Sequence, residues 1–155
     1  MFGEGLIGAG ITTFFMAMIP VIELRGALPV GVAGGLPVWA ATVIAIFGNM
    51  VPIPFILLLL RRIFAWLRSF PKLGSFIDKL ERHAHLKGKT VKKYRTLGLF
   101  VLVAIPLPGT GAWTGALVAD VLDMRMKTAL PAIFAGVCVA GVIVALMTTG
   151  VVYLS

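Results

Sequence analysis

Two charged residues lie inside an otherwise apolar stretch near the start of the chain. Glu23 and Arg25 are flanked by Pro20 on one side and by Gly26 and Pro29 on the other. A charge at membrane depth costs about 2.5–3.5 kcal/mol on insertion scales, so such residues normally face a bundle interior or a cavity and pair with a partner. The flanking breakers predict irregular backbone, which would let each side chain address a different partner. The pair is a candidate for coupling transport to an ion or for contacting a substrate. The alternative is a fixed ion pair that only holds two helical hairpins of the protein together.

A second candidate is the segment Pro-Gly-Thr-Gly-Ala-Trp-Thr-Gly at 108–115. A half-helix that begins near Thr110 would direct unpaired backbone N–H groups and the positive end of its dipole toward an anionic group. The glycines also have a packing explanation, because small residues let membrane helices approach closely. Both interpretations stay open. The candidate substrate- or ion-binding residues of this segment are Pro108, Gly109, Thr110, Gly111, Trp113 and Thr114.

Two more polar residues interrupt apolar sequence. Asn49, shortly before Pro52 and Pro54, marks a predicted kink, and its amide could either hydrogen-bond the freed backbone or contact a substrate. Asp120 could join Glu23 in a proton relay, since carboxylates within membrane segments commonly serve that purpose. The alternative for Asp120 is a solvated carboxylate near the membrane interface.

The sequence does not predict an enzyme, a cofactor site or a metal site. It shows no nucleophile–base pair, no P-loop and no cluster of metal-ligand residues. Cys138 stands alone, so we expect it to be a small apolar residue within a helix. His83 and His85 are two positions apart and would lie on different faces of a helix.

The composition places most of the chain in lipid. Hydrophobic residues make up 59% and charged residues 13%, and the mean hydropathy is +1.03. An average soluble domain has about 25% charged residues, and a soluble fold of about 150 residues buries only about 68–70% of its surface. These values exclude a secreted globular domain, a cytosolic enzyme of ordinary composition and a disordered chain.

The positive charges are concentrated in one segment. Of 14 Lys and Arg, 11 lie between Arg61 and Arg95, where only Asp78 and Glu81 offset them, so 61–95 carries +9 and the rest of the chain −1. The positive-inside rule places such a segment in the cytoplasm, and we expect no nucleic-acid partner. Apolar residues recur within it at helical spacing and predict an amphipathic helix that binds anionic lipid, or a solvated loop with an apolar underside; these residues are Leu73, Phe76, Ile77, Leu80 and Ala84.

The long uncharged intervals predict the other elements. About 20 apolar residues suffice to cross a bilayer, which predicts transmembrane helices over 36–60 and 126–154. Two further apolar stretches end early in Pro and Gly, and predict re-entrant hairpins over 5–35 and 96–124. Broken backbone at membrane depth is tolerated only when it is buried in protein or lines a wet cavity, so the breaks themselves indicate a site. The alternative topology makes 5–22 a complete span.

A weak internal repeat relates the two halves. Ala45-Ile-Phe-Gly48 resembles Ala132-Ile-Phe-Ala-Gly136, about 87 positions later. We therefore predict an all-α integral membrane protein with a single domain over 1–155. It consists of two inverted repeats, each a re-entrant hairpin plus one transmembrane helix, joined by the basic amphipathic segment 61–95. Many secondary transporters are built from inverted repeats.

Three stretches together resemble the family of putative small multidrug export proteins. They are Glu23-Leu-Arg25-Gly26-Ala-Leu-Pro29, Gly48-Asn49-Met-Val-Pro52-Ile-Pro54 and Ile105-Pro106-Leu-Pro108-Gly109-Thr110-Gly111-Ala112-Trp113-Thr114-Gly115. That family is similar to the wider DedA-like (VTT-type) membrane proteins, which have paired re-entrant hairpins and are associated with proton-dependent transport and lipid-carrier movement. The resemblance implicates Glu23 and Arg25 in the first hairpin and 108–115 in the second.

We therefore expect a secondary transporter in the cytoplasmic (inner) membrane of a prokaryote, coupled to an ion gradient such as that of protons. Its substrate would be an amphipathic or anionic small molecule. The alternatives are a DedA-like flippase or scramblase for lipids or lipid phosphates, and a membrane scaffold that transports nothing. Two spans and two hairpins barely enclose a pathway, so we also expect a homodimer.

Overall fold

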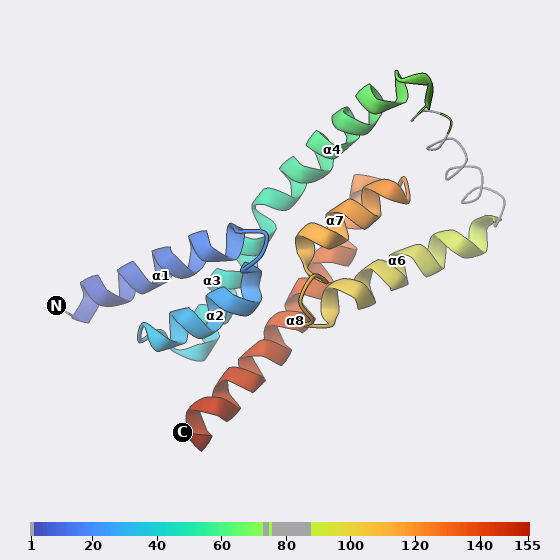
Figure 1. Cartoon of the computed structure of the whole chain (residues 1–155). Coiled ribbons are helices and arrows are strands. Elements are labelled where there is room, and N and C mark those ends of the chain that lie inside the picture. The colour runs from blue at the N-terminus through green and yellow to red at the C-terminus, as the bar shows by residue number, and fades with distance from the viewer. Residues whose placement is uncertain (1, 73–74, 76–87) are drawn as a thin grey trace.

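The structure is a computed structural model that describes residues 2–72, 75 and 88–155 (Figure 1). These residues form helices and contain no strand. The helices are α1 (Phe2–Met18), α2 (Glu23–Ala33), α3 (Val38–Met50), α4 (Pro52–Arg68), α6 (Gly88–Ala104), α7 (Ala112–Val121) and α8 (Met126–Leu154). The predicted all-helical fold is confirmed for the part of the chain that the structure describes.

Two helices are long and apolar enough to cross a membrane. One runs through α3 and α4 over Val38–Leu67 and has 30 residues, and the other is α8 with 29 residues. At 1.5 Å per residue these helices are about 43–45 Å long, which exceeds the roughly 30 Å hydrocarbon core of a bilayer. The spans predicted over 36–60 and 126–154 fall on these two helices, and the first helix continues to Arg68.

The first long helix is divided into α3 and α4 at Val51, just before the prolines that predict a kink. Pro52 and Pro54 have no backbone N–H, so they cannot donate to the carbonyls of Gly48 and Met50 one turn earlier. The chain keeps right-handed helical angles at Val51, with φ −54° and ψ −47°, so α4 follows directly on α3.

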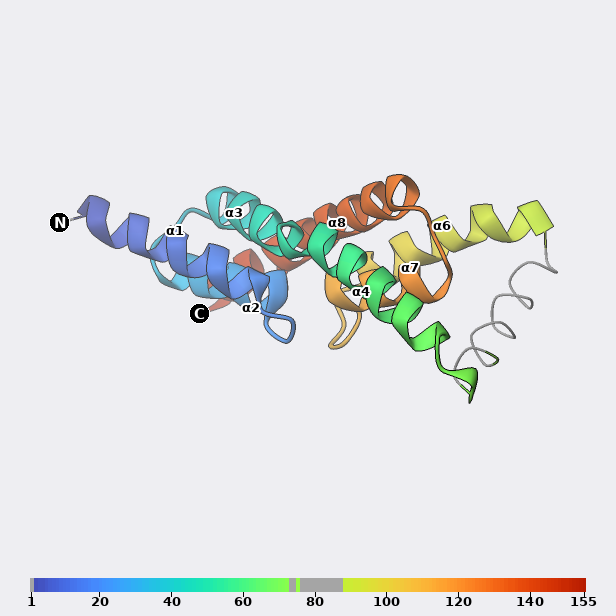
Figure 2. The same cartoon turned by 90° about the horizontal axis from the view of Figure 1, so that it is seen from above.

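Each half of the chain places a pair of short helices before a long one. Helices α1 and α2 form a hairpin that packs on α3, and α6 and α7 form a hairpin that packs on α8. The halves also contact each other, because α2 packs on α8 and α7 packs on α4. As a result the turns of the two hairpins lie side by side in the middle of the molecule, a placement visible in both Figure 1 and Figure 2.

The same glycine contact recurs in both halves. A Cβ at Gly136 in α8 would lie 2.9 Å from the carbonyl oxygen of Phe100 in α6. A Cβ at Gly48 in α3 would lie too close to the carbonyl oxygen of Phe14 in α1. Glycine therefore allows the first hairpin helix to approach the long helix of its own half, as small residues do at helix interfaces in membranes. Gly48 and Gly136 are the glycines that end the two similar stretches of the internal repeat, with one extra residue in the second stretch.

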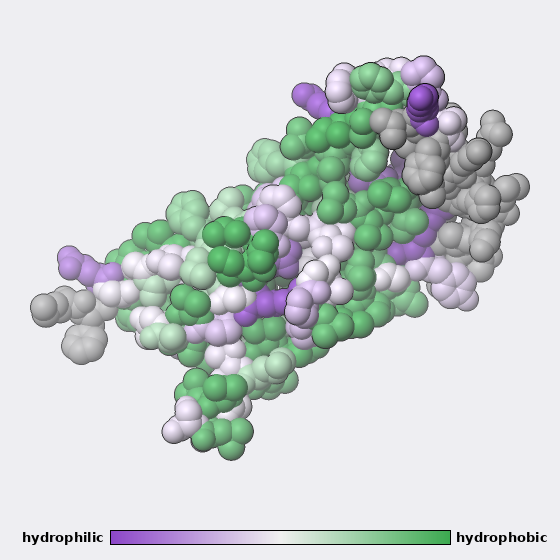
Figure 3. Space-filling model, viewed as in Figure 1, coloured by the Kyte–Doolittle hydropathy of each residue, from purple (hydrophilic) through white to green (hydrophobic). Residues whose placement is uncertain are grey.

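The interior contains many small residues beside buried leucines and isoleucines, and many other large apolar side chains are exposed on the surface. Ala17, Ala45, Ala116 and Ala129 are fully buried, while side chains such as Leu146 are 68% exposed. Figure 3 shows the resulting apolar surface on both sides of a polar patch in the middle of this face, where the hairpin turns lie. A surface of this kind is suited to lipid, because soluble monomers rarely expose continuous apolar patches of this extent.

The basic segment predicted over 61–95 is described at its two ends. Helix α4 continues through Arg61 to Arg68, and α6 begins at Gly88, so regular helix enters the segment from both sides. The predicted amphipathic stripe from Leu73 to Ala84 lies outside the described residues, and so do His83 and His85.

Overpacking the recurring glycine contact is expected to destabilise the fold. We predict that Gly136→Ala and Gly48→Ala each lower the free energy of unfolding by about 1–3 kcal/mol, because a methyl group must displace backbone that has no room to move. Thermal unfolding in detergent measures this effect. Gly98→Ala is the matched control, since nothing lies within 4 Å of its Cβ position in α6. An unchanged unfolding temperature in both test variants would show that these helices do not pack as described.

Candidate functional site

The first hairpin turns sharply just before its charged residues. Helix α1 ends at Met18, and the backbone N–H of Glu23 donates to the Ile19 carbonyl at 2.9 Å to close the turn. Glu23 has a φ of +48°, in the left-handed region that residues with a side chain rarely adopt. Such a conformation costs about 1–3 kcal/mol and persists only where the surroundings determine it. The strain therefore falls on a residue that the sequence marks as a candidate for function.

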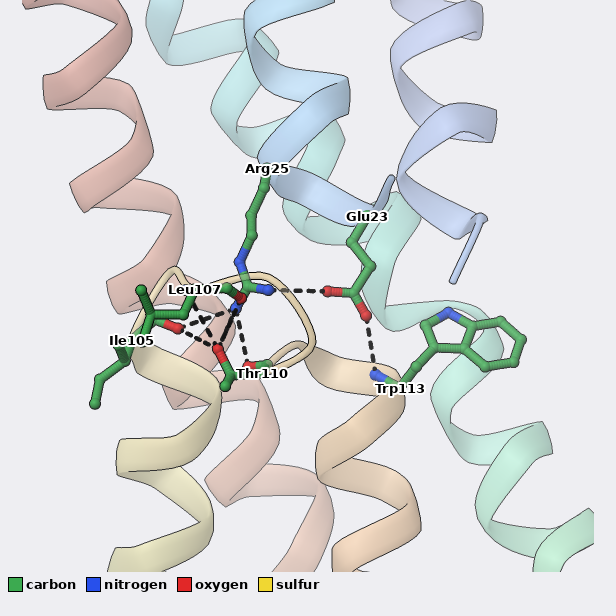
Figure 4. A network of polar contacts seen from close by, with 6 residues as sticks. All are labelled: Glu23, Arg25, Ile105, Leu107, Thr110 and Trp113. Atoms are coloured by element: carbon green, nitrogen blue, oxygen red, sulfur yellow. Dashed lines mark hydrogen bonds and ion pairs between the residues drawn. The ribbon is translucent and has the colours of Figure 1, made fainter. Parts of the chain in front are cut away.

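The carboxylate of Glu23 caps a helix of the other hairpin. Its Oε1 accepts a hydrogen bond of 3.2 Å from the backbone N–H of Trp113, the second residue of α7 (Figure 4). The N-cap residue of α7 is Gly111, which has no side chain with which to make this bond. Glu23 thus supplies from α2 the acceptor that an N-cap side chain normally provides, and its negative charge lies at the positive end of the helix dipole.

Gly111 is required for this contact. A Cβ at this position would overlap both carboxyl oxygens of Glu23. The sequence predicts that the helix of the second hairpin begins near Thr110 and receives an anionic group. The helix begins instead at Ala112, and the group at its first turn is a carboxylate of the protein itself.

Arg25 binds the turn between α6 and α7. Its Nη2 donates to the carbonyl oxygens of Ile105 at 3.0 Å and Thr110 at 2.9 Å, and to the Thr110 hydroxyl at 3.1 Å. The hydroxyl of Thr110 in turn donates to the Ile105 carbonyl at 2.7 Å. Helix α6 ends at Ala104, and Pro106 and Pro108 remove donors just beyond it, so carbonyls of this turn become available to the guanidinium.

The two charged side chains also face each other. Nη1 of Arg25 lies 3.9 Å from Oε2 of Glu23, so the pair is an ion pair without a hydrogen bond. Figure 4 shows that they address different parts of the second hairpin: Arg25 the turn, and Glu23 the start of α7. The sequence predicts separate partners for these two residues, and the structure has them.

Asn49 lies beside this network and is buried. Its side chain is 3% exposed, and its Oδ1 has no hydrogen-bond partner within the described part of the chain. Together with Glu23, Arg25 and Gly111 it lines a cavity of about 10 Å³, which has the size of one water molecule. Asn49 therefore lies beside the network. Its contact with a substrate and its bond to the backbone freed by the prolines both stay predictions.

The structure brings only part of the predicted set together. Glu23, Arg25 and Asn49 meet the second hairpin at three of the predicted residues of 108–115, namely Thr110, Gly111 and Trp113. Pro108 and Gly109 are exposed in the turn, where Gly109 has a φ of +83°, and Thr114 is half-buried in α7. Asp120 lies near the far end of α7, about 12 Å along the helix from its first residue, so it is not part of this network.

The sequence does not predict two contacts at the turn that follows the second hairpin. Nη2 of Arg61 donates to the Met124 carbonyl at 2.8 Å, and Nη1 of Arg95 donates to the Leu122 carbonyl at 3.0 Å. Both arginines thus hold the turn between α7 and α8. In the sequence they count among many positive charges, and no local pattern distinguishes them. The contact of the Ile105 carbonyl with Arg25 is also not predicted from the sequence. Pro106 and Pro108 nevertheless indicate backbone carbonyls without a helical donor near this position.

Fold and site together define the class: a small helical membrane protein in which two apolar hairpins are joined at their turns by a buried carboxylate and a guanidinium. The chain belongs to the family described as "Putative small multi-drug export protein", whose family model matches residues 23–143. That range begins at Glu23 and includes the whole network. The comparisons find no matching curated protein and no matching solved structure. Membership supports a general role in export or transport.

Gly111→Ala tests the contact between the hairpins. We expect this variant to displace the Glu23 carboxylate from α7 and to lower the free energy of unfolding by about 1–3 kcal/mol, as overpacking does elsewhere. In a Glu23→Ala background the same change is expected to cost much less, because the two residues act on one interaction. Thermal unfolding of the four proteins in this double-mutant cycle measures the coupling. Additive effects would contradict the contact, and Gly98→Ala again controls for adding a methyl group.

Proposed function

We propose that the protein is a secondary transporter, most simply coupled to protons, in which the network between the hairpin turns is a latch. The observation that carries this proposal is the capping of α7 by Glu23 from the opposite hairpin. Opening this latch would part the two hairpins in the middle of the molecule, where transporters with broken helices place their binding sites.

A proton can compete for the same carboxylate. When ionised, Glu23 is attracted both to the first turn of α7 and to Arg25 at 3.9 Å. Protonation removes the charge that both interactions depend on, and a charge-assisted hydrogen bond is about twice as strong as a neutral one. The protonated latch is therefore weaker, which links proton binding to the separation of the hairpins. A proton bound at Glu23 is the coupling step in this scheme.

We further propose that the two halves are inverted repeats and that both hairpins are re-entrant. The repeated order of two short helices and one long one supports this, as does the glycine contact shared by Gly48 and Gly136. The basic segment 61–95 then lies in the cytoplasm against anionic lipid, and the location is the inner membrane of a prokaryote. The proposal includes a homodimer, because two long helices and two short hairpins leave little room for a pathway within one chain.

Cysteine labelling tests the re-entrant first hairpin. In a Cys138→Ala background, we expect a membrane-impermeant maleimide to label Gly3→Cys and Pro37→Cys from the same, external side, because a re-entrant hairpin returns to the side it started from. Gly3 has nothing within 4 Å of its Cβ position, so cysteine is accommodated there. Ser69→Cys, at the end of α4, is the internal reference and should react only after permeabilisation. Labelling of Gly3→Cys and Pro37→Cys from opposite sides would make α1 a complete span and contradict the proposal.

Flux in proteoliposomes tests the latch. The probes are ethidium as a cation and anilinonaphthalene sulfonate as an anion, each followed with and without a pH gradient. We expect Glu23→Gln and Arg25→Ala to reduce gradient-driven flux by about tenfold or more, because each removes a charged partner worth about 1.5–3 kcal/mol. Glu4→Gln is the matched control, since Glu4 is an exposed carboxylate in the first turn of α1. Equal flux in the wild type and both latch variants would remove the two residues from the mechanism.

A further inference from the structure

A groove runs beside the latch, between α2 and the C-terminal half of α8. It has a volume of about 570 Å³, within the range of about 300–1,000 Å³ typical of small-molecule sites. Helix α2 lines it with Arg25, Pro29 and Val32, and α8 lines it with Val144, Met147 and Val151. In each helix these residues recur at helical spacing, so two parallel stripes face the groove over about 10 Å. Apart from Arg25 and Thr148, the residues that line the groove are apolar, so it is a mostly apolar slot.

The slot is open at its side and charged at one end. Met147 and Val151 are 63% and 67% exposed, so a long apolar molecule can enter between the helices. Arg25 is the charged residue of the lining, and it lies at the end next to the turn between α6 and α7. In Figure 4, α8 passes on the side of Arg25 that faces away from Glu23. One end of the groove thus offers a guanidinium, and the rest of its lining is apolar except for Thr148.

Arg25 retains donors for a ligand. A guanidinium has five N–H groups, and the hydrogen bonds to the second hairpin all come from Nη2. Within the described part of the chain, Nε and Nη1 donate to no acceptor, because the Glu23 oxygen at 3.9 Å is beyond hydrogen-bond distance. The side chain is 19% exposed. An anion can therefore bind Arg25 without displacing its contacts to the turn.

We infer that this groove binds an amphiphile from the membrane that has one apolar chain and an anionic carboxylate head. The chain lies between α2 and α8, and the carboxylate accepts from Arg25. A cationic head would be repelled by the positive charge of Arg25. A neutral head would lack the stronger hydrogen bonds that a carboxylate makes with a guanidinium. That such an amphiphile is also the transported substrate rests on the proposed function, whereas its binding does not.

Photolabelling in vesicles tests this inference on the full-length protein. The probe is dodecanoate with a diazirine near the end of its chain, in vesicles of phosphatidylcholine, with labelled peptides identified by mass spectrometry. We expect labelling of α8 around Met147 and Val151, and at least tenfold stronger competition by dodecanoate than by dodecanol or dodecyltrimethylammonium. Equal competition by the three compounds, or stronger competition by the cation, would overturn the inference.

Matched variants locate the site. Met147→Trp fills the groove and is expected to reduce labelling at least tenfold, whereas Leu146→Trp, at an equally exposed neighbour outside the lining, should leave it unchanged. Arg25→Gln should abolish the preference for the anionic competitor. Labelling that responds equally to both tryptophan variants would overturn the assignment. Specific labelling without any flux would contradict the proposed transporter and support the binding site. Flux that depends on Glu23, together with unspecific labelling, would support the transporter and contradict the binding site.

Discussion

The carboxylate of Glu23 is 5% exposed, and a charge so far from solvent has to be compensated by groups of the protein. Its compensation comes from the first turn of α7 and from Arg25, which belong to different hairpins. The arrangement of the fold follows from this requirement, because α7 must begin at the turn of the first hairpin. The close approach of the carboxylate to α7 leaves no space for a side chain at Gly111, and it coincides with the left-handed φ of Glu23.

Arg25 serves two partners with one guanidinium. Its Nη2 holds the turn of the second hairpin, its Nη1 lies 3.9 Å from Oε2 of Glu23, and the residue also lines the groove. A ligand anion at Arg25 would compete with Glu23 for the positive charge, and a proton on Glu23 would release that charge to the ligand. Under the proposed function, proton and anion therefore favour each other's binding at adjacent positions. Such linkage is a free-energy coupling between two ligands, and it needs no long path through the protein.

Sequence alone predicts the helices and the residues of the latch, but not how they are connected. Charges in apolar sequence and Pro-Gly breaks are local signals, so Glu23, Arg25 and 108–115 can be recognised. Which oxygen caps which helix depends on the meeting of segments about 90 positions apart, and no local pattern encodes it. For the same reason Arg61 and Arg95 are predicted only as cytoplasmic charges, although both hold the turn after α7.

The two halves share a glycine contact but not the chemistry of their turns. Gly48 and Gly136 each let the first helix of a hairpin approach the long helix of the same half. At the turns the first hairpin contributes two charged side chains, whereas the second contributes backbone N–H and carbonyl groups and one hydroxyl. Under the proposed function, a change of protonation at the latch can occur only on the first hairpin, because the second hairpin contributes backbone groups and one hydroxyl. Under the proposed function, this asymmetry leaves the Glu23 carboxylate as the group whose protonation controls the contact.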